Sequence, residues 1–442
     1  MAHLAVLLKE LGHEVSGSDQ GIYSPMKELL EQGGIPVHPE YDARNIANPD
    51  CVIVGNAIGR GNVELEAVLD RQLVFRSQAE VLKTELLERR RVAVVAGTHG
   101  KTTCSAMLSW LLQDLDPGFL VGGIPINYGS GARAGGGSTF VVEGDEYDTA
   151  FFDKGPKFLH YRPWVVLLNH VEFDHADIYA DLDSYLLSFE RLANVIPSSG
   201  RLVMYAHGPG VERIRRRARC PVITFGSEGA DHRPVDIVAD GQGRRSFCVS
   251  GIEGRFRSAL IGNHNIVNAT GCLLAARELG IPLGRAAELL PEFRGVRRRQ
   301  ELVLDRNGLL LYDDFAHHPT AIAETLRAFR ESLPERRLWA VFEPRSWSMR
   351  KSVFQDALPG SFCDADKVII GPVFQSSKVA DVLDPQSVAD SINASGGDAA
   401  YSGSVDEIVE RVSSQSQSGD AIIVLSNGAF GGLVGKLKAG LG

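Results

Sequence analysis

The stretch VAVVAGTHGKTTCSAML, residues 92–108, constrains the fold of this chain more than any other. A run of small and β-branched residues leads into a glycine turn, and a lysine, two threonines and a helical pattern follow. A strand, a glycine-rich turn and a helix in this order are typical of a phosphate-binding loop. The usual spacing, G-x-x-x-x-G-K-[ST], would place a glycine at Val95, whereas here the glycine comes two residues later, at Gly97. The stretch therefore predicts an anion site at the beginning of a helix.

Each part of this loop has a physical role in holding phosphate. Backbone N–H groups at the start of a helix point towards a bound anion, and the helix dipole adds to the attraction. Glycines let the backbone approach phosphate oxygens, Lys101 supplies positive charge, and the Thr102 hydroxyl can bind Mg²⁺. The alternative is a tight turn with a solvated lysine, but the strand and the helix stand where a phosphate loop needs them. The residues that we expect to bind a nucleotide here are Gly97, Thr98, His99, Gly100, Lys101, Thr102 and Thr103.

Acidic and histidine side chains follow the next two predicted strands of this region. The stretch FVVEGDEYD places Glu143 at the end of an apolar strand, where ligands gather in open α/β sheets. The following strand ends in NHVEFDHAD, which contains Asn169, His170, Glu172, Asp174 and His175. An acidic loop is often only solvated surface, and a lone histidine is mostly structural. Two histidines and two carboxylates beside a phosphate loop favour an active site instead, in which a hard cation would take oxygen ligands.

Composition limits the classes of protein that the chain can belong to. Its 442 residues suggest two to four domains at roughly 100–200 residues each. A net charge of −9 argues against a nucleic-acid partner, and no apolar stretch reaches the roughly 18 residues of a membrane span. The six cysteines form no C-x-x-C pair, which argues against a zinc knuckle or a disulfide framework. We therefore expect a cytoplasmic protein, since no signal peptide is visible either.

Three α/β units are predicted along the chain. Region 1–89 is expected to be Rossmann-like; it opens on an amphipathic helix at 2–11, so the strand and glycine turn that normally come first would lie before the sequence begins. Region 90–300 alternates apolar runs with helical patterns, which predicts a P-loop ATPase-like domain with a mostly parallel sheet and an antiparallel edge at 230–262. Region 301–442 repeats the strand–loop–helix pattern and predicts a second Rossmann-like domain.

Six stretches resemble the signatures of the Mur ligases. They occur in the order of that family across essentially the whole chain, and together they are highly specific. The stretches are GTHGKTT (97–103), EGDEYD (143–148), NHVEFDH (169–175), GNHNIVNA (262–269), FRGVRRR (293–299) and DDFAHHP (313–319). The shifted glycine of the phosphate loop is normal in this family. The resemblance implies an ATP-dependent ligase that forms an amide bond.

The resemblance also implies catalytic and metal-binding roles. Lys101 would contact the β- and γ-phosphates of ATP, and Thr102 would bind Mg²⁺. Glu143 would be a metal ligand, and His175 would contact a second metal ion. Arg298 or Arg299 would be the arginine on the ATP side of the third domain. The catalytic residues that the resemblance implies are therefore Lys101, Glu143, His175 and Arg298.

Further residues of these stretches would bind the nucleoside. His264, Asn265 and Asn268 would lie near the adenine, and Asp313 would be the acid on the ribose side. The residues alone predict less, because the two asparagines read as a helix cap and surface polar side chains. His317 and His318 fall in a matching motif, where capping or packing by one of them is at least as good an explanation as catalysis.

Other stretches indicate which amine-bearing substrate is joined to the sugar nucleotide. DEYDTAFFDKGPKF, EFDHADIY, VFEPRSWSMR and LSNGAFGG resemble the members of the family that join UDP-N-acetylmuramate to the murein tripeptide L-alanyl-γ-D-glutamyl-meso-diaminopimelate in peptidoglycan recycling. Members that attach L-alanine share the phosphate loop and HHPT but do not usually carry FFDK or SNGAFGG. The tripeptide is thus the expected acceptor, and L-alanine is the alternative.

Substrate contacts are expected from polar residues in loops. The candidates for the sugar nucleotide are Ser18, Asp19, Asn56 and Asn127. Arg345 is the candidate for a peptide carboxylate, because its planar fork suits bidentate recognition, although it could instead only stabilise its loop. We expect a monomer or a homodimer.

Other functions stay open at this point. A folylpolyglutamate-synthase-like enzyme shares the architecture, but HHP and DEYD argue against it. A nucleotide-binding switch or an ATPase without ligase chemistry would not need DDFAHHP. An inactive sugar-nucleotide-binding protein fits poorly, since the first strand of its domain would be lacking.

Overall fold

The computed structural model of the chain describes residues 1–22, 26–173, 179, 181–239, 244–346, 349–375 and 381–441. Contacts between residues divide the chain into two compact units. Unit 1 consists of Met1–Asp236, Phe247–Phe256 and Val267–Phe293. Unit 2 consists of Ile237–Ser246, Arg257–Ile266 and Arg294–Gly442.

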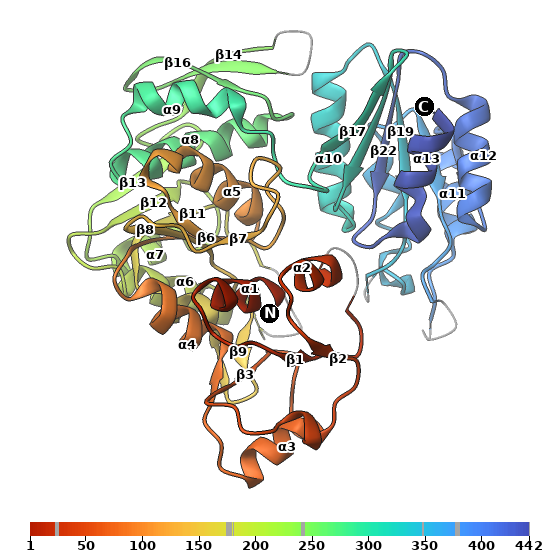
Figure 1. Cartoon of the computed structure of the whole chain (residues 1–442). Helices are drawn as coiled ribbons and strands as arrows, with labels where there is room; N and C mark the ends of the chain where they lie inside the picture. The colour runs from red at the N-terminus through yellow and green to blue at the C-terminus, as the bar shows by residue number, and fades with distance from the viewer. Residues whose placement is uncertain are drawn as a thin grey trace. The chain divides into compact units, whose positions relative to one another are not determined.

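A seven-stranded sheet forms the centre of unit 1, in the order β13-β12-β11-β5-β8-β6-β7 (Figure 1). Its strands are β5 (Arg91–Ala96), β6 (Gly118–Leu120), β7 (Ala132–Arg133), β8 (Thr139–Glu143), β11 (Pro163–Leu168), β12 (Arg201–Tyr205) and β13 (Val222–Phe225). Every pair is parallel except β6 with β7. Continuous apolar strands of this kind are buried on both faces, and the mostly parallel sheet that the sequence predicts is confirmed.

Helices cover both faces of this sheet. Val92, Val94 and Ala96 of β5 share one hydrophobic core with residues of α6 (Leu182–Asn194) and α7 (Val211–Arg217). The opposite face is covered by α5 (Lys101–Leu111), α8 (Asn263–Glu278) and α9 (Leu283–Leu289) (Figure 1). Successive residues of a strand point to opposite faces, so a strand such as VAVVA can be apolar throughout.

The first part of unit 1 contains less sheet than the sequence predicts. Its elements are α1 (Ala2–Glu10), β1 (Gly17–Ser18), α2 (Met26–Gln32), β2 (Val37–His38), β3 (Val52–Val54), α3 (Val63–Asp70), β4 (Phe75–Ser77) and α4 (Gln78–Leu82). The strands form two separate parallel pairs, β1 with β2 and β3 with β4. Ser77 begins α4 with a capping box, in which Glu80 bonds back to the Ser77 backbone. A π-helical turn, Lys83–Leu87, directly follows α4.

Two small sheets accompany the main one. The FFDK stretch (151–154) forms the turn between β9 (Asp148–Ala150) and β10 (Asp153–Pro156), which pair antiparallel, and the first two residues of β10. The expected antiparallel edge at 230–262 is instead a separate three-stranded sheet of β14 (Pro234–Ala239), β15 (Arg245–Val249) and β16 (Ile252–Ser258). The boundary between the two compact units falls within this segment.

Unit 2 is built around a six-stranded sheet in the order β17-β18-β22-β19-β20-β21. Its strands are β17 (Glu301–Arg306), β18 (Leu309–Asp314), β19 (Arg337–Phe342), β20 (Lys367–Ile370), β21 (Ala399–Tyr401) and β22 (Asp420–Leu425). Only β17 runs antiparallel to its neighbour. One face packs against α10 (Pro319–Ser332) and α11 (Pro385–Ala394), and the other against α12 (Val405–Gln415) and α13 (Leu433–Leu441). Helices on both faces confirm the second doubly wound unit.

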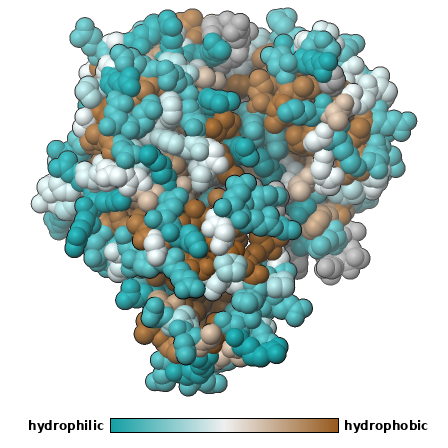
Figure 2. All heavy atoms as spheres, viewed as in Figure 1, coloured by the Kyte–Doolittle hydropathy of each residue, from teal (hydrophilic) through white to brown (hydrophobic). Residues whose placement is uncertain are grey.

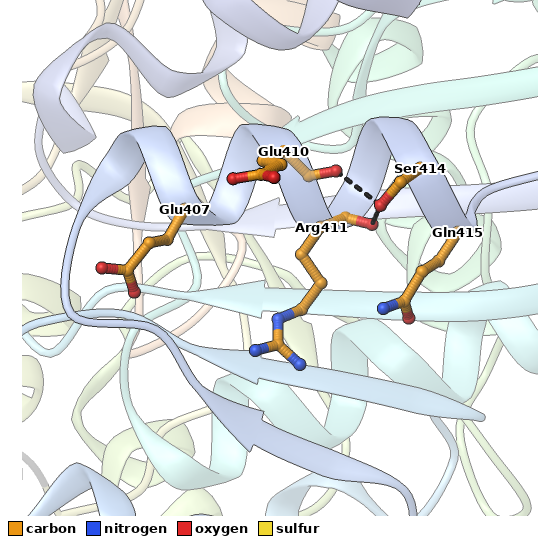
Figure 3. A pocket seen from close by; sticks show the side chains of 5 residues that line it. All are labelled: Glu407, Glu410, Arg411, Ser414 and Gln415. Carbon is orange, nitrogen blue, oxygen red and sulfur yellow. Dashed lines mark hydrogen bonds between the residues drawn. The ribbon is translucent and has the colours of Figure 1, made fainter.

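Hydrophilic residues predominate on the face drawn in Figure 2, with apolar residues between them. No helix among the described residues is both long and apolar enough to cross a membrane. A depression on unit 2 is lined by Glu407, Glu410, Arg411, Ser414 and Gln415 (Figure 3). All five side chains come from α12, so the depression is a groove along one helix.

Candidate active site

Three neighbouring strands of unit 1 end at one edge of the sheet. In the register of the sheet, Ala96 of β5 lies beside Leu168 of β11, and Val95 lies beside Glu143 of β8. The phosphate loop after β5 is therefore flanked by Glu143 on one side and by the segment 169–172 on the other. Ligands bind at the carboxyl ends of strands in open parallel sheets, and the residue types gathered here fit that rule.

Glycine is required at both ends of the loop 97–100. Gly97 and Gly100 have φ angles of +119° and +75°, which L side chains rarely adopt. A Cβ atom at Gly100 would lie 2.7 Å from Nδ2 of Asn169 and 2.9 Å from Oδ1 of Asn268. Gly100 also caps the N-terminus of α5, whose free N–H groups begin here. The strand, loop and helix predicted from the apolar run, the glycine turn and the helical pattern are confirmed.

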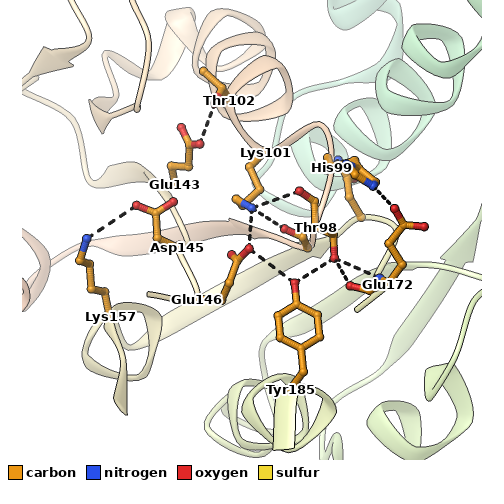
Figure 4. A network of polar contacts seen from close by, with 12 residues as sticks. Thr98, His99, Lys101, Thr102, Glu143, Asp145, Glu146, Lys157, Glu172 and Tyr185 are labelled. Carbon is orange, nitrogen blue, oxygen red and sulfur yellow. Dashed lines mark hydrogen bonds and ion pairs between the residues drawn. The ribbon is translucent and has the colours of Figure 1, made fainter. Parts of the chain in front are cut away.

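Lys101 is held by the loop itself and by a buried carboxylate. Its Nζ donates to the carbonyl oxygen of Gly97 at 2.8 Å and to Oε1 of Glu146 at 3.0 Å (Figure 4). The side chain of Glu146 has no exposed surface, and that of Lys101 is 13% exposed. Glu146 is the functional candidate that sequence reasoning did not single out, although it belongs to the acidic EGDEYD stretch. The pair fixes the position of the positive charge before any nucleotide binds.

Thr102 and Glu143 form an oxygen-rich pair on the other side of Lys101 (Figure 4). The Thr102 hydroxyl donates to Oε1 of Glu143 at 2.7 Å, and the Gly122 N–H donates to Oε2 at 2.7 Å. Removal from water raises the pKa of Glu143, and the nearby charge of Asp145 raises it further. A hydroxyl and a carboxylate side by side are the donor set that Mg²⁺ prefers, so these residues fit the metal that the sequence implies.

Backbone contacts join the phosphate loop to the segment after β11. The Thr98 N–H donates to the carbonyl oxygen of His170 at 2.8 Å. The Thr98 hydroxyl donates to the carbonyl oxygen of Glu172 at 2.8 Å and lies 2.9 Å from the hydroxyl of Tyr185. His99 and Glu172 are joined through Nε2 and Oε1. His175, the expected ligand of a second metal ion, lies outside the described residues.

Asn169 and Asn268 meet beside Gly100. Nδ2 of Asn169 donates to the carbonyl oxygen of His99 at 3.2 Å and to Oδ1 of Asn268 at 3.4 Å. The structure thus brings Asn268 to the phosphate loop. Thr103 follows in the first turn of α5. The expected contact of Asn268 with adenine stays a prediction.

The other two residues expected near the adenine belong to unit 2. Asn265 is buried, and its Nδ2 donates to the carbonyl oxygen of Ile261 at 2.7 Å and to Oε1 of Gln300 at 3.2 Å. His264 is exposed in the first turn of α8. Desolvation lowers the pKa of the His264 imidazole to about 4, so this ring is neutral at pH 7, whereas the Asn265 amide already serves contacts within the unit.

Arg298, which precedes β17, lies beside Asp313 of β18. Nε of Arg298 lies 3.4 Å from Oδ2 of Asp313, and its Nη2 donates to the carbonyl oxygen of Gly428 at 2.7 Å. Burial raises the pKa of Asp313 to about 6, against the opposing effect of Arg298. Of the two candidate arginines, Arg298 is therefore the one that the structure pairs with the acid. Arg299 lies over the ring of Phe315.

Arg345 is engaged within its own part of unit 2. Its Nη1 lies 3.4 Å from Oε1 of Glu343, and its guanidinium carbon lies 3.7 Å from the ring centre of Phe374. A Cβ atom at Gly428 would lie 1.9 Å from Nε of Arg345. This close approach explains why the first glycine of the SNGAFGG stretch, Gly428, carries no side chain. The guanidinium is stacked and oriented, and its side chain remains 27% exposed.

The residues expected to hold the sugar nucleotide are spread over several loops. Ser18 accepts from Nδ2 of Asn45 at 3.3 Å, and Asp19 accepts from the Gly21 N–H at 2.8 Å. Asn56 is exposed in the turn after β3. Asn127 donates to the carbonyl oxygen of Glu292 at 2.9 Å. Ser18 ends β1 and Asn56 follows β3, and the binding of the sugar nucleotide by these residues stays a prediction.

Comparisons with known proteins agree with this arrangement. Three family models match successive parts of the chain: Mur ligase family, catalytic domain (residues 1–90), Mur ligase middle domain (95–276) and Mur ligase, glutamate ligase domain (298–428). This confirms the predicted three-domain architecture, while the boundaries at 89 and 300 stay predictions.

Individual relatives match over the whole length. The chain is 39% identical to the UDP-N-acetylmuramate–L-alanyl-γ-D-glutamyl-meso-2,6-diaminoheptandioate ligase of Escherichia coli, over 100% of the chain and 96% of that protein. It is 33% identical to a UDP-N-acetylmuramate–L-alanine ligase of Desulfitobacterium hafniense, over 94% of the chain and 92% of that protein. The crystal structure of a murein peptide ligase from Psychrobacter arcticus matches with a TM-score of 0.72 and 35% identity, covering 100% of this chain and 96% of that one. The chain therefore belongs to the Mur ligase family, whose members are ATP-dependent ligases that form carbon–nitrogen bonds.

Proposed function

We propose that this enzyme joins UDP-N-acetylmuramate to the tripeptide L-alanyl-γ-D-glutamyl-meso-diaminopimelate. The observation that carries the proposal is the 39% identity, over the whole chain, to the E. coli ligase named for these two substrates. Identity to the L-alanine ligase of D. hafniense is lower, at 33%. The FFDK and SNGAFGG stretches favour the same choice, and the second of them lies against Arg345.

The reaction needs ATP because a carboxylate is a poor acylating agent. A carboxylate oxygen of the lactyl group attacks the γ-phosphorus of ATP, the bond to the β–γ bridging oxygen breaks, and ADP leaves. The resulting acyl phosphate is attacked at its carbonyl carbon by the α-amine of the tripeptide. Inorganic phosphate leaves, the amine loses a proton, and an amide remains.

The phosphate loop would supply positioning and charge neutralisation for this transfer. Backbone N–H groups at the start of α5 would bind phosphate oxygens, and Lys101 would place its ammonium group beside the outer phosphates. Thr102 and Glu143 would hold Mg²⁺, which when bound supplies further positive charge. Glu146 would act as a positioning residue, since it fixes the Lys101 ammonium at 3.0 Å.

Arg345 would bind a carboxylate of the tripeptide. Its guanidinium is oriented by stacking on Phe374 and by the ion pair with Glu343, and an oriented fork loses less entropy when it binds. Arg298 and Asp313 would contact the nucleoside, as the resemblance of their motifs implies.

The experiment that tests the function is an assay of ADP release with UDP-N-acetylmuramate and either the tripeptide or L-alanine. We expect turnover with the tripeptide and little with L-alanine. Faster turnover with L-alanine would assign the chain to the alternative acceptor. ADP release that needs neither acceptor would indicate an ATPase without ligase chemistry.

The roles of Lys101 and Glu143 are tested in the same assay. Lys101→Ala and Glu143→Ala should each lower kcat by about 10²–10³-fold, as for the loss of one group that stabilises transition-state charge. Arg216→Ala, which removes an exposed cation of the same domain, is the matched control. Near-normal amide formation in both site variants would contradict the proposed site.

A further inference from the structure

We propose that His99, His170 and Glu172 form a metal site for a transition-metal ion of the zinc class, separate from the metal positions that the resemblance assigns to Glu143 and His175. One ring nitrogen of each histidine and one carboxylate oxygen of Glu172 lie within 4.8 Å of one another. Among the residues that the structure describes, this is the group of histidine, cysteine and acidic side chains with such spacing. The proposal does not depend on the identity of the ligase substrates.

The chemistry of the donors selects the class of metal. Two imidazole nitrogens and one carboxylate oxygen are the ligands of many zinc sites that keep a position open for water. Mg²⁺ prefers oxygen ligands alone, and these are supplied by Thr102 and Glu143 on the other side of Lys101 (Figure 4). The two sites would therefore take different ions.

The three side chains need only rotate to reach one ion. Nε2 of His99 already contacts Oε1 of Glu172, and Nδ1 of His170 lies 3.9 Å from Oε2. Ligand atoms around a tetrahedral zinc ion are about 3.4 Å apart, since each bond is about 2.1 Å long. The rings of His99 and His170 lie nearly parallel, at 13°, with centroids 6.1 Å apart.

The backbone beneath these side chains is already fixed. Thr98 bonds to His170 through its N–H and to Glu172 through its hydroxyl, which also accepts from the Glu172 N–H at 3.0 Å. The hydroxyl of Tyr185 lies 2.9 Å from the same Thr98 oxygen. A metal site with a rigid frame loses little entropy on binding. The side chains of His99 and Glu172 are 43% and 42% exposed, so an ion can enter from solvent.

Other histidine–carboxylate pairs of the chain lack the third donor that the His99, His170 and Glu172 group has. His13 lies 3.4 Å from Glu85, and His160 lies 2.8 Å from Asp153. In the described part of the chain, neither pair belongs to a group with a third donor at metal-binding distance. An isolated pair of this kind is an ion pair or a hydrogen bond. The His99–Glu172 contact becomes part of a metal-binding group because His170 supplies the third donor.

The test measures metal binding by the full chain in the absence of nucleotide. Zn²⁺ is titrated against a chromophoric chelator, and Co²⁺ replaces it to give a visible absorption spectrum that reports imidazole coordination. We expect the wild-type chain to bind one Zn²⁺ that tenfold excess Mg²⁺ does not displace. His170→Asn and Glu172→Gln should each weaken binding by at least tenfold and abolish the Co²⁺ spectrum. His13→Asn, which removes another exposed histidine that is paired with a carboxylate, should bind as the wild type does.

Three results would overturn the proposal. The first is a wild-type chain that binds no Zn²⁺, and the second is unchanged Zn²⁺ binding in both His170→Asn and Glu172→Gln. The third is loss of Zn²⁺ in Glu143→Gln with full binding in His170→Asn, which would place the ion at the magnesium position. Far-UV circular dichroism checks that each variant is folded, and either of the two cluster variants alone suffices for the comparison. Ligase turnover is not the readout, so failure here leaves the proposed function intact.

Discussion

Nζ of Lys101 lies 3.0 Å from Oε1 of Glu146, a carboxylate whose side chain has no exposed surface. The lysine that the sequence assigns to the phosphates of ATP is thus held in place by a residue 45 positions later in the chain. An ammonium group that is already oriented does not have to be immobilised when the nucleotide arrives. The pair links the stability of the central domain to the geometry of its phosphate loop.

Removing Glu146 should destabilise the protein more than removing an exposed partner of a lysine. Glu146→Ala leaves the largely buried Lys101 without its carboxylate, and breaking a buried pair costs about 3–5 kcal/mol. Asp148→Ala breaks the exposed pair with Lys154 (2.7 Å) and should cost less than about 1 kcal/mol. Urea unfolding measures both free energies. Equal losses in the two variants would mean that burial of Glu146 does not matter.

Gly100→Ala should damage both the fold and nucleotide binding. The φ of +75° alone costs an L residue about 1–2 kcal/mol, and a Cβ would clash with the Asn169 amide at 2.7 Å. Gly12→Ala is the matched control, because Gly12 has a φ of +93° but nothing within 4 Å of a Cβ. We expect Gly12→Ala to lose only the stability that the positive φ costs an L residue, and to bind ATP as tightly as the wild type does. Calorimetric titration with ATP would contradict the prediction if both variants bound equally well.

The sequence predicted those parts of the site that depend on local pattern. The strand at 92–96, the glycines of the loop and the helix at Lys101 follow from hydrophobic periodicity and turn chemistry within about 20 residues. Glu143 was found because it ends the next apolar run. These residues come together because parallel strands end at one edge of the sheet, a rule that needs no knowledge of contacts.

Long-range pairing could not be read from the sequence. Nothing local distinguishes Glu146, which pairs with Lys101, from Asp145 and Asp148 in the same acidic loop. The pairing of Arg298 rather than Arg299 with Asp313 depends on the backbone at Arg298, whose φ is +60°. In the first domain the strands are only two or three residues long, and such short lengths cannot be read from the sequence because a strand extends only as far as its neighbour pairs with it.

Asp313 should make the stability of the protein depend on pH. Its pKa rises from about 3.8 in the unfolded chain to about 6 in the folded one, so the folded state favours the protonated carboxyl. The stabilisation is present in full below pH 4 and is lost as the pH rises through 6; two pKa units correspond to about 3 kcal/mol. Asp313→Asn stays neutral and should gain stability relative to the wild type between pH 4 and pH 7.

Urea unfolding at several pH values measures this difference. Asp305→Asn changes an exposed carboxyl on the neighbouring strand β17 and serves as the control. A constant difference between Asp313→Asn and the wild type across this range would show that Asp313 has an ordinary pKa in the folded protein.

Arg345 should determine the affinity for the peptide rather than for ATP. Loss of a charge-assisted, bidentate contact costs about 1.5–3 kcal/mol, so Arg345→Ala should raise the KM for the tripeptide by roughly 10–150-fold and leave the KM for ATP within about twofold. Arg345→Lys keeps the charge but not the planar fork and should recover only part of the loss. Arg411→Ala, in the groove along α12 of the same unit (Figure 3), should change neither constant. Because Arg345 also stacks on Phe374 and pairs with Glu343, a purely structural role would lower the melting temperature and kcat without a selective change in the KM for the tripeptide. A rise confined to the KM for ATP would exclude Arg345 as the peptide anchor.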